Sequence, residues 1–207
     1  MIMNYEPGEI YHVYNQGNNR QKLFFNRDNY VFFVNKMRVH LTDHCDILAW
    51  CLMPNHFHWL IKVKNHKAQV GSGLKDTPLQ DSVPPLNRSL SVLFSSYTKA
   101  INKMHGRSGS LFRSKTKAKK LNSDKTKTDN YPIVCFLYIH QNPIRAELVS
   151  HLQDWEFSSY RDFAGLRNGS LCNQDLAIEL LNLPQNKREF VSFSEQTIPD
   201  AFIKNLY

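Results

Sequence analysis

The sequence has few cysteines, no long hydrophobic run and no apolar leader. Its four cysteines among 207 residues include no Cys-x-x-Cys pair, so neither a zinc ribbon nor a disulfide framework is expected. No apolar run reaches the roughly 18 residues of a membrane span, and residues 1–9 contain no signal-peptide core. With 42% hydrophobic and 21% charged residues, a wholly disordered chain is excluded. These absences predict a folded protein of the reducing cytoplasm that does not bind a membrane.

Acidic residues are scarce in one segment, 99–127. The segment contains ten lysines and arginines, and its one acidic residue is Asp124. Its net charge is therefore +9, whereas the net charge of the whole chain is +8. Clustered cations gain affinity for a polyanion by displacing its counterions, so a nucleic-acid partner is one interpretation. A solvated basic face that aids solubility is the other, and charge alone does not separate the two.

The first part of the chain alternates between strand and helix patterns. Residues 10–16 alternate as a strand and end in a polar loop at 16–20. Asn26 is expected to cap a helix, because apolar residues follow it at helical spacing. These residues are Tyr30, Phe33, Val34, Met37 and Leu41. Residues 47–53 and 56–63 then predict two strands joined by a Pro-Asn turn.

The middle of the chain completes the pattern. Residues 64–85 show no periodicity and predict a long mobile loop, and an amphipathic helix follows at 86–104. Residues 111–121 predict a strand with four cations on one face. The four are Arg113, Lys115, Lys117 and Lys119. A third helix is expected from Pro132 to about Asn142, because Pro143 follows. This order predicts an α+β sandwich of the ferredoxin-like kind, an antiparallel sheet with helices packed on it.

The sharpest local motif is His56-Phe57-His58. On a strand, residues two apart point to the same face, so both imidazoles converge while Phe57 and Trp59 face the core. Two histidines alone do not hold a metal tightly, and a third ligand must come from elsewhere in the fold. A metal site and an ordinary hydrogen-bonded histidine pair both fit this motif.

The predicted third helix carries two further candidates, Tyr138 and Asn142. They are four residues apart and share a helical face. A tyrosine hydroxyl is a nucleophile if its pKa is lowered or a base assists, and the Asn142 side-chain oxygen suits Mg²⁺ or Mn²⁺. In the alternative, Tyr138 is packed and Asn142 only ends the helix. His140 falls on the packing face and is expected to be a buried structural histidine.

Five motifs together resemble one family. Residues 53–61 resemble the HUH-motif strand of single-tyrosine transposases, and residues 138–146 resemble their tyrosine helix. Residues 16–20, 109–112 and 155–160 resemble further landmarks of that family, in the same order. The sequence is most similar to the REP-associated tyrosine transposases, which carry Asn-Pro at this point. The resemblance covers about residues 5–163, so we expect a transposase domain at 1–163 and a helical extension or tail at 164–207.

The resemblance implies a role for each matching residue. His56 and His58 would bind a divalent metal, Mg²⁺ or Mn²⁺, and Tyr138 would be the nucleophile. Asn142 would complete the metal site; Gln141 is the weaker alternative because it lies at a different angle on the helix. The residues expected to contact DNA are Asn18, Arg20, Arg113, Lys115, Lys117 and Lys119.

The implied activity is cleavage and rejoining of single-stranded, hairpin-associated DNA through a 5′-phosphotyrosine, by a monomer or homodimer. One alternative is a non-catalytic regulatory protein that binds hairpin DNA with the same fold. Another is a nicking enzyme of the replication-initiator or relaxase kind, which shares the chemistry. Such enzymes are larger and often carry a second tyrosine or a helicase domain, so they fit this sequence less well.

Overall fold

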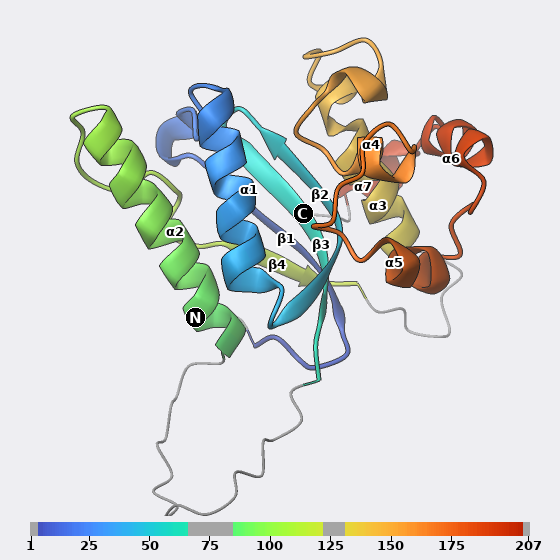
Figure 1. Cartoon of the computed structure of the whole chain (residues 1–207), viewed down its shortest axis with the longest axis horizontal. Helices are drawn as coiled ribbons and strands as arrows, with labels where there is room; N and C mark the ends of the chain where they lie inside the picture. The colour runs from blue at the N-terminus through green and yellow to red at the C-terminus, as the bar shows by residue number, and fades with distance from the viewer. Residues whose placement is uncertain (1–3, 66–84, 122–130, 205–207) are drawn as a thin grey trace, which may run out of the picture.

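The computed structural model describes residues 4–65, 85–121 and 131–204 (Figure 1). The first part contains β1 (Ile10–Gln16), η1 (Asn18–Arg20), α1 (Arg27–Leu41), β2 (Cys45–Met53), β3 (His56–Val63), α2 (Pro85–Met104) and β4 (Lys117–Lys120). The second contains α3 (Tyr131–Arg145), η2 (Leu152–Asp154), α4 (Tyr160–Phe163), α5 (Gln174–Leu181), α6 (Lys187–Ser194) and α7 (Asp200–Lys204). The predicted loop at 64–85 falls almost entirely outside the described residues. Among the helices described, none is long and apolar enough to cross a membrane.

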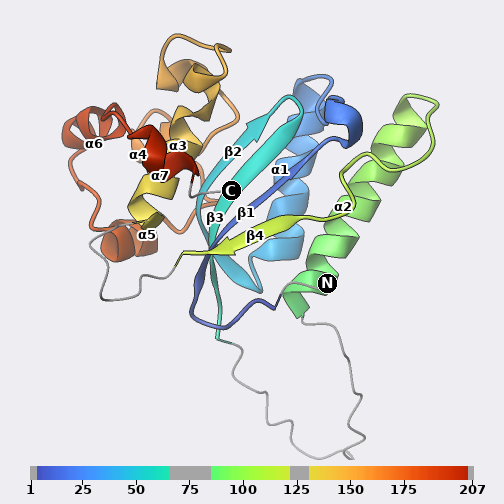
Figure 2. The ribbon, with the colours of Figure 1, turned by 180° about the vertical axis from the view of Figure 1, so that it is seen from behind.

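The four strands form one antiparallel sheet in the order β2-β3-β1-β4 (Figure 2). With α1 between β1 and β2 and α2 between β3 and β4, this is the ferredoxin-like arrangement, and the predicted fold class is confirmed. The predicted hairpin of β2 and β3 is also confirmed, with Met53 paired to His56 across the turn. β1 lies between β3 and β4, so it connects the hairpin to the basic strand.

Helices α1 and α2 cover one face of the sheet and enclose an aromatic core (Figure 1). The Asn26 side chain caps α1 by accepting a hydrogen bond from the Asn29 backbone, as predicted. Phe33 is fully buried, with its ring centroid 5.8 Å from that of Phe57 and 4.7 Å from that of Tyr97. The alternate residues of β3 therefore face this core, which leaves the histidines on the opposite face.

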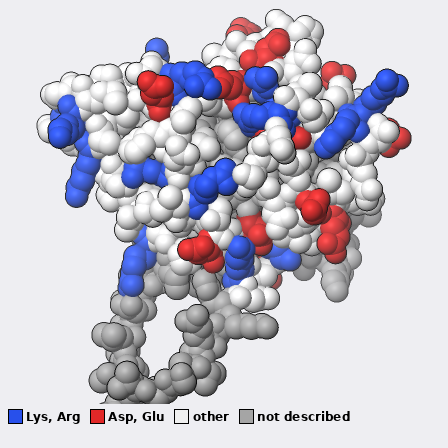
Figure 3. All heavy atoms as spheres, in the orientation of Figure 1, with Lys and Arg blue, Asp and Glu red and all other residues white. Residues whose placement is uncertain are grey.

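Helix α3 packs on the opposite face of the sheet, over β2 and β3, with α6 and α7 against it, while α5 contacts β2. The β1–β4 half of that face has no helix over it among the described residues, as the view in Figure 2 shows. On the side seen in Figure 3, basic and acidic side chains are interspersed.

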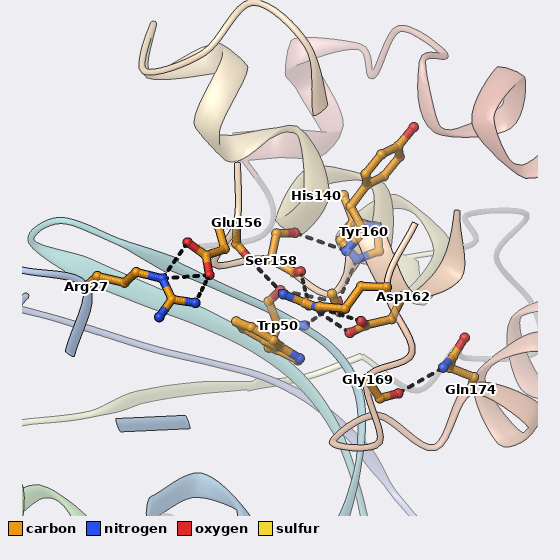
Figure 4. Close-up of polar contacts among 11 residues, drawn as sticks. Arg27, Trp50, His140, Glu156, Ser158, Tyr160, Asp162, Gly169 and Gln174 are labelled. Carbon is orange, nitrogen blue, oxygen red and sulfur yellow. Dashed lines mark hydrogen bonds and ion pairs between the residues drawn. The ribbon is translucent and has the colours of Figure 1, made fainter. Parts of the chain in front are cut away.

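Residues 155–160 bind along β2 (Figure 4). The Leu52 amide donates to the Phe157 carbonyl at 2.9 Å, and the Ser159 amide donates to the Trp50 carbonyl at 2.9 Å. Arg167 holds this segment, because its guanidinium donates to the Ser158 carbonyl at 2.7 Å and to Asp162 at 2.6 Å. The segment is thus fixed by backbone pairing and by Arg167, which also forms an ion pair with the buried carboxylate of Asp162.

His140 faces the same region from α3. It is 1% exposed, and its Nε2 atom lies 2.8 Å from the Ser159 hydroxyl. The prediction of a buried structural histidine is confirmed.

Candidate active site

The strand β3 places His56 and His58 on the face that α3 partly covers. The antiparallel register sets Gln16 opposite His56 and Tyr14 opposite His58, and directly opposed residues point to the same face. The predicted convergence of the two imidazoles is confirmed, with ring centroids 5.1 Å apart.

Both imidazoles have an orienting partner. The Nδ1 atom of His56 donates to the Asn55 side-chain oxygen at 2.6 Å, because that oxygen can only accept, and the lone pair of His56 is then on Nε2. The Nδ1 atom of His58 lies 2.9 Å from Nε2 of His12, a fully buried residue of β1. Hydrogen bonds of this kind fix the ring orientation of metal-binding histidines.

Burial keeps the two histidines neutral at pH 7. It lowers the pKa of His56 from its usual value to about 4. Burial, with His12 and His56 nearby, holds the pKa of His58 well below its usual value. Metal binding needs the neutral imidazole, so the protonation state of both residues fits a metal ligand.

Tyr138 extends from α3 towards the histidines. Its ring is perpendicular to that of His58, with centroids 5.6 Å apart, and lies 6.4 Å from that of His12. The tyrosine is 5% exposed. The fold therefore brings the predicted nucleophile and the histidine pair together from segments about 80 residues apart in the sequence.

Asn142 lies one turn further along α3. It is 6% exposed, and its side-chain amide donates to the Tyr138 carbonyl at 2.9 Å, which leaves Oδ1 as its donor atom for a cation. The prediction that the helix ends near Asn142 is wrong, because α3 continues through Pro143 to Arg145. Proline removes a single N–H, and the helical bonding resumes when the Ala146 amide donates to the Asn142 carbonyl at 2.9 Å.

Two imidazoles and one amide oxygen would form a mixed donor set. Among the described residues, no group of three or more His, Cys, Asp or Glu could hold a metal ion. A site here would therefore use His56 and His58, with an oxygen donor such as Asn142 as the third ligand. Imidazole and oxygen ligands together suit Mn²⁺, and oxygen ligands suit Mg²⁺.

A cavity of about 320 Å³ opens beside the histidines, on the half of the face that none of the described helices covers. We call it the histidine cavity. Its lining consists of Tyr14, Asn15, Gln16, His56, Phe57, His58, Arg113, Lys115 and Lys117. Three cations and two imidazoles around one hollow form a site suited to a phosphate group. Tyr138 and Asn142, on α3, are not among the lining residues.

The basic row differs from its prediction. Only Lys117–Lys120 form a strand, so Arg113 and Lys115 precede it in an irregular segment. In this segment the side chain of Asn15 takes the place of regular backbone pairing, because it donates to the Arg113 carbonyl at 3.2 Å and to the Thr116 hydroxyl at 3.0 Å. Arg113, Lys115 and Lys117 nevertheless line the cavity. Lys119 is paired with His12 across the ladder and is not part of the lining.

The polar loop with Asn18 and Arg20 lies beside the turn of the hairpin. The Asn18 amide donates to the Leu111 carbonyl at 2.9 Å, and the Arg20 carbonyl accepts from the Asn55 side chain at 3.4 Å. Both residues are exposed and neither lines the histidine cavity. The loop is thus bonded both to residues 109–112 and to the hairpin. Three of the sequence motifs, residues 16–20, 53–61 and 109–112, therefore meet here.

His12, Tyr14 and Asn15 also belong to the site, although no sequence motif indicates them. Tyr14 lines the cavity, and its ring centroid lies 5.7 Å from that of His58, as close as Tyr138. The available signal was the alternation of β1, which puts His12 and Tyr14 on one face. Their proximity to the histidines depends on the β1–β3 register, which alternation does not specify.

Comparison of the sequence with protein-family models and with curated proteins gives no match. Among solved structures, a REP-associated tyrosine transposase bound to a REP hairpin is similar over 96% of this chain and 98% of its own, with a TM-score of 0.56 and 17% identity. The chain shares the fold of that structure. The α+β fold implied by the resemblance is thereby confirmed, and the similarity extends over the C-terminal helices as well as over the sheet.

Proposed function

We propose that the protein is a metal-dependent transposase or endonuclease of the HUH type, which cleaves and rejoins hairpin-associated single-stranded DNA. The observation that carries the proposal is the contact between the Tyr138 ring and His58, next to a cavity lined by three cations. A nucleophile, a candidate metal site and a phosphate-binding surface are the parts that phosphodiester transfer requires. The shared fold with a hairpin-bound transposase supports the same conclusion.

In the proposed reaction, the Tyr138 hydroxyl oxygen attacks the phosphorus of the scissile phosphodiester. The bond from phosphorus to the 3′ oxygen breaks, the 5′ phosphate stays on Tyr138, and the 3′ oxygen takes up the proton that the tyrosine loses. Attack by a 3′-hydroxyl on the phosphotyrosine reverses these steps. No external energy source is needed, because one phosphate ester bond is exchanged for another and the phosphotyrosine conserves the energy of the broken bond.

The remaining residues hold and orient the DNA. His56 and His58, with Asn142 as the oxygen donor, would bind the divalent metal, which polarises a phosphate oxygen and orients the phosphate. Arg113, Lys115 and Lys117 would bind the phosphates on either side, since they surround the same cavity.

The test is to locate the covalent adduct. Tyr138→Phe should eliminate the protein–DNA adduct while hairpin binding is retained, because the ring still packs against His58. Tyr14→Phe is the matched control, since Tyr14 lies equally close to His58 but on β1. Mass spectrometry of the digested adduct identifies the modified tyrosine. An adduct on Tyr14, or one that persists in Tyr138→Phe, would contradict the assignment.

A non-catalytic hairpin-binding protein is the second candidate, favoured by one observation. Tyr138 is 5% exposed and does not line the histidine cavity, so its hydroxyl must become accessible before it can react. The same experiment separates the candidates. Hairpin binding without an adduct on any tyrosine, at any Mn²⁺ or Mg²⁺ concentration, would indicate the binding protein.

A further inference from the structure

A second hollow lies on the opposite side of segment 113–116 from the histidine cavity. It encloses about 540 Å³ between α2 and residues 109–116, and we call it the polar groove. Four polar residues of α2 contribute to it at helical spacing and therefore share one face. They are Ser91, Ser95, Thr98 and Asn102.

The polar groove adjoins the histidine cavity. Asn15 and Arg113 line both hollows. The side chain of Asn15 also bonds the Arg113 carbonyl and the Thr116 hydroxyl, so it fixes the segment that separates them. A chain-like ligand with a phosphate in the histidine cavity can pass this segment and continue along α2.

The lining of the groove suits a polyanion. It contains the cations Lys99 and Arg113 together with hydroxyl and amide groups, and none of its lining residues is acidic. Phe94 and Phe112 form the apolar floor of the groove, with ring centroids 4.9 Å apart and Phe112 buried in the core. Cations, hydroxyls and amides are the usual partners of sugar and phosphate, so the polar rim of the groove carries the expected contacts.

The serine side chains are positioned to change partner. The hydroxyl of Ser95 donates to the Val92 carbonyl at 3.2 Å and that of Ser91 to the Asn87 carbonyl at 2.9 Å, both within α2. Both residues are exposed, so rotation about the Cα–Cβ bond turns either hydroxyl towards a ligand. A helix with a core-facing side so rich in Leu, Phe and Tyr has no need of this polar row for its own packing.

We propose that the polar groove binds the single-stranded DNA that flanks the scissile phosphate. The inference rests on the proposed function, because that function places the scissile phosphate in the histidine cavity. It assigns to α2 a role in binding substrate in addition to its role in the core.

Site-specific cross-linking tests the proposal without requiring cleavage. All four native cysteines are buried, so Ser95→Cys introduces one accessible thiol, which can carry a photoactivatable aryl azide. Val92→Cys is the matched control, because Val92 is 45% exposed on the same helix but does not line the groove. The probes are a DNA hairpin with single-stranded flanks and the same hairpin without flanks.

The expected result is a cross-link from Ser95→Cys to nucleotides of the single-stranded flank, with none from Val92→Cys and none to the bare hairpin. As an independent measure, Ser95→Glu should weaken binding of the flanked hairpin about tenfold by repelling phosphates, whereas Val92→Glu should not. Equal cross-linking at the two positions, or cross-links confined to the hairpin stem, would overturn the proposal.

The outcomes also separate this inference from the proposed function. If the wild-type protein forms the Tyr138 adduct but Ser95→Cys does not cross-link to the flank, the groove proposal is wrong and the catalytic proposal stands. If Ser95→Cys cross-links to the flank and no adduct forms, the groove proposal is supported and the catalytic proposal is wrong.

Discussion

The Nε2 atom of His12 lies 2.9 Å from the Nδ1 atom of His58, and this contact joins β1 to β3 behind the histidine cavity. His12 is outside the His-x-His motif, yet it fixes one of the two imidazoles that carry the proposed metal site. Removing a hydrogen-bond partner of a metal-binding histidine lowers metal affinity by about 10- to 100-fold.

We therefore expect His12→Ala to raise the Mn²⁺ concentration needed for half-maximal adduct formation by about 10- to 100-fold. His12→Gln should restore most of the affinity, because its amide can still hydrogen-bond to His58. The measurement is adduct yield against Mn²⁺ concentration. Unchanged metal dependence in His12→Ala would show that the contact is only structural.

The proposed metal dependence gives a second prediction. EDTA should abolish adduct formation, and His56→Ala should do the same without lowering the unfolding temperature, because His56 is at the cavity rather than in the core. Adduct formation in gels, with and without EDTA and with Mn²⁺ restored, measures this. Full activity in EDTA would mean that the histidines have no role as metal ligands.

The basic lining of the cavity predicts a salt effect. Lys115→Glu with Lys117→Glu should weaken binding to all DNA sequences and reduce the slope of log K against log salt, by about 0.7 for each single-strand phosphate that the protein no longer neutralises. Arg188→Glu with Lys204→Glu changes the net charge equally at exposed sites on α6 and α7 and is the control. Equal effects of the two double variants would show that only total charge matters.

His140 predicts how stability depends on pH. Burial lowers its pKa to about 3 in the folded protein, whereas the usual value is 6.5. As the pH falls below about 6.5, the unfolded chain takes up a proton that the folded protein does not. This histidine should therefore lower the free energy of unfolding by about 1.4 kcal/mol per pH unit between pH 6 and 4. Urea denaturation at several pH values should show a shallower slope in His140→Gln.

Two neighbouring ion pairs, Arg167–Asp162 and Arg27–Glu156, should contribute differently to the stability of the fold. Asp162 has a 1% exposed side chain, so Arg167→Met leaves a buried carboxylate unpaired and should cost about 3 kcal/mol of stability. Arg27 and Glu156 form an exposed pair in the same view (Figure 4), and Arg27→Met should not change the unfolding midpoint measurably. A similar decrease in stability in both variants would contradict this interpretation.

The sheet and its first two helices were predictable because their signals are local. The cap at Asn26, the apolar spacing of α1 and the Pro-Asn turn each specify backbone conformation within a few residues. The convergence of His56 and His58 follows from the two-residue period of a strand. These features did not depend on any distant part of the chain.

The predictions from the sequence were wrong or incomplete where contacts with distant residues determine the local structure. Segment 113–116 leaves the regular ladder where the side chain of Asn15, almost 100 residues earlier, bonds the Arg113 carbonyl and the Thr116 hydroxyl, and a local pattern does not reveal this contact. Helix α3 continues past Pro143 because only one N–H is lost there and the Ala146 amide donates to the Asn142 carbonyl, which the local proline signal does not predict. His12 and Tyr14 were missed because only the β1–β3 register places them beside His58.

The sheet is also protected along both of its outer strands. The outer edge of β2 is hydrogen-bonded to residues 157–159. At the opposite edge of the sheet, β4 is only four residues long, and three of the four are lysine. Short, cationic or covered outer strands oppose the addition of a strand from another molecule, which is a common first step of aggregation. The protein should therefore stay dispersed at high concentration.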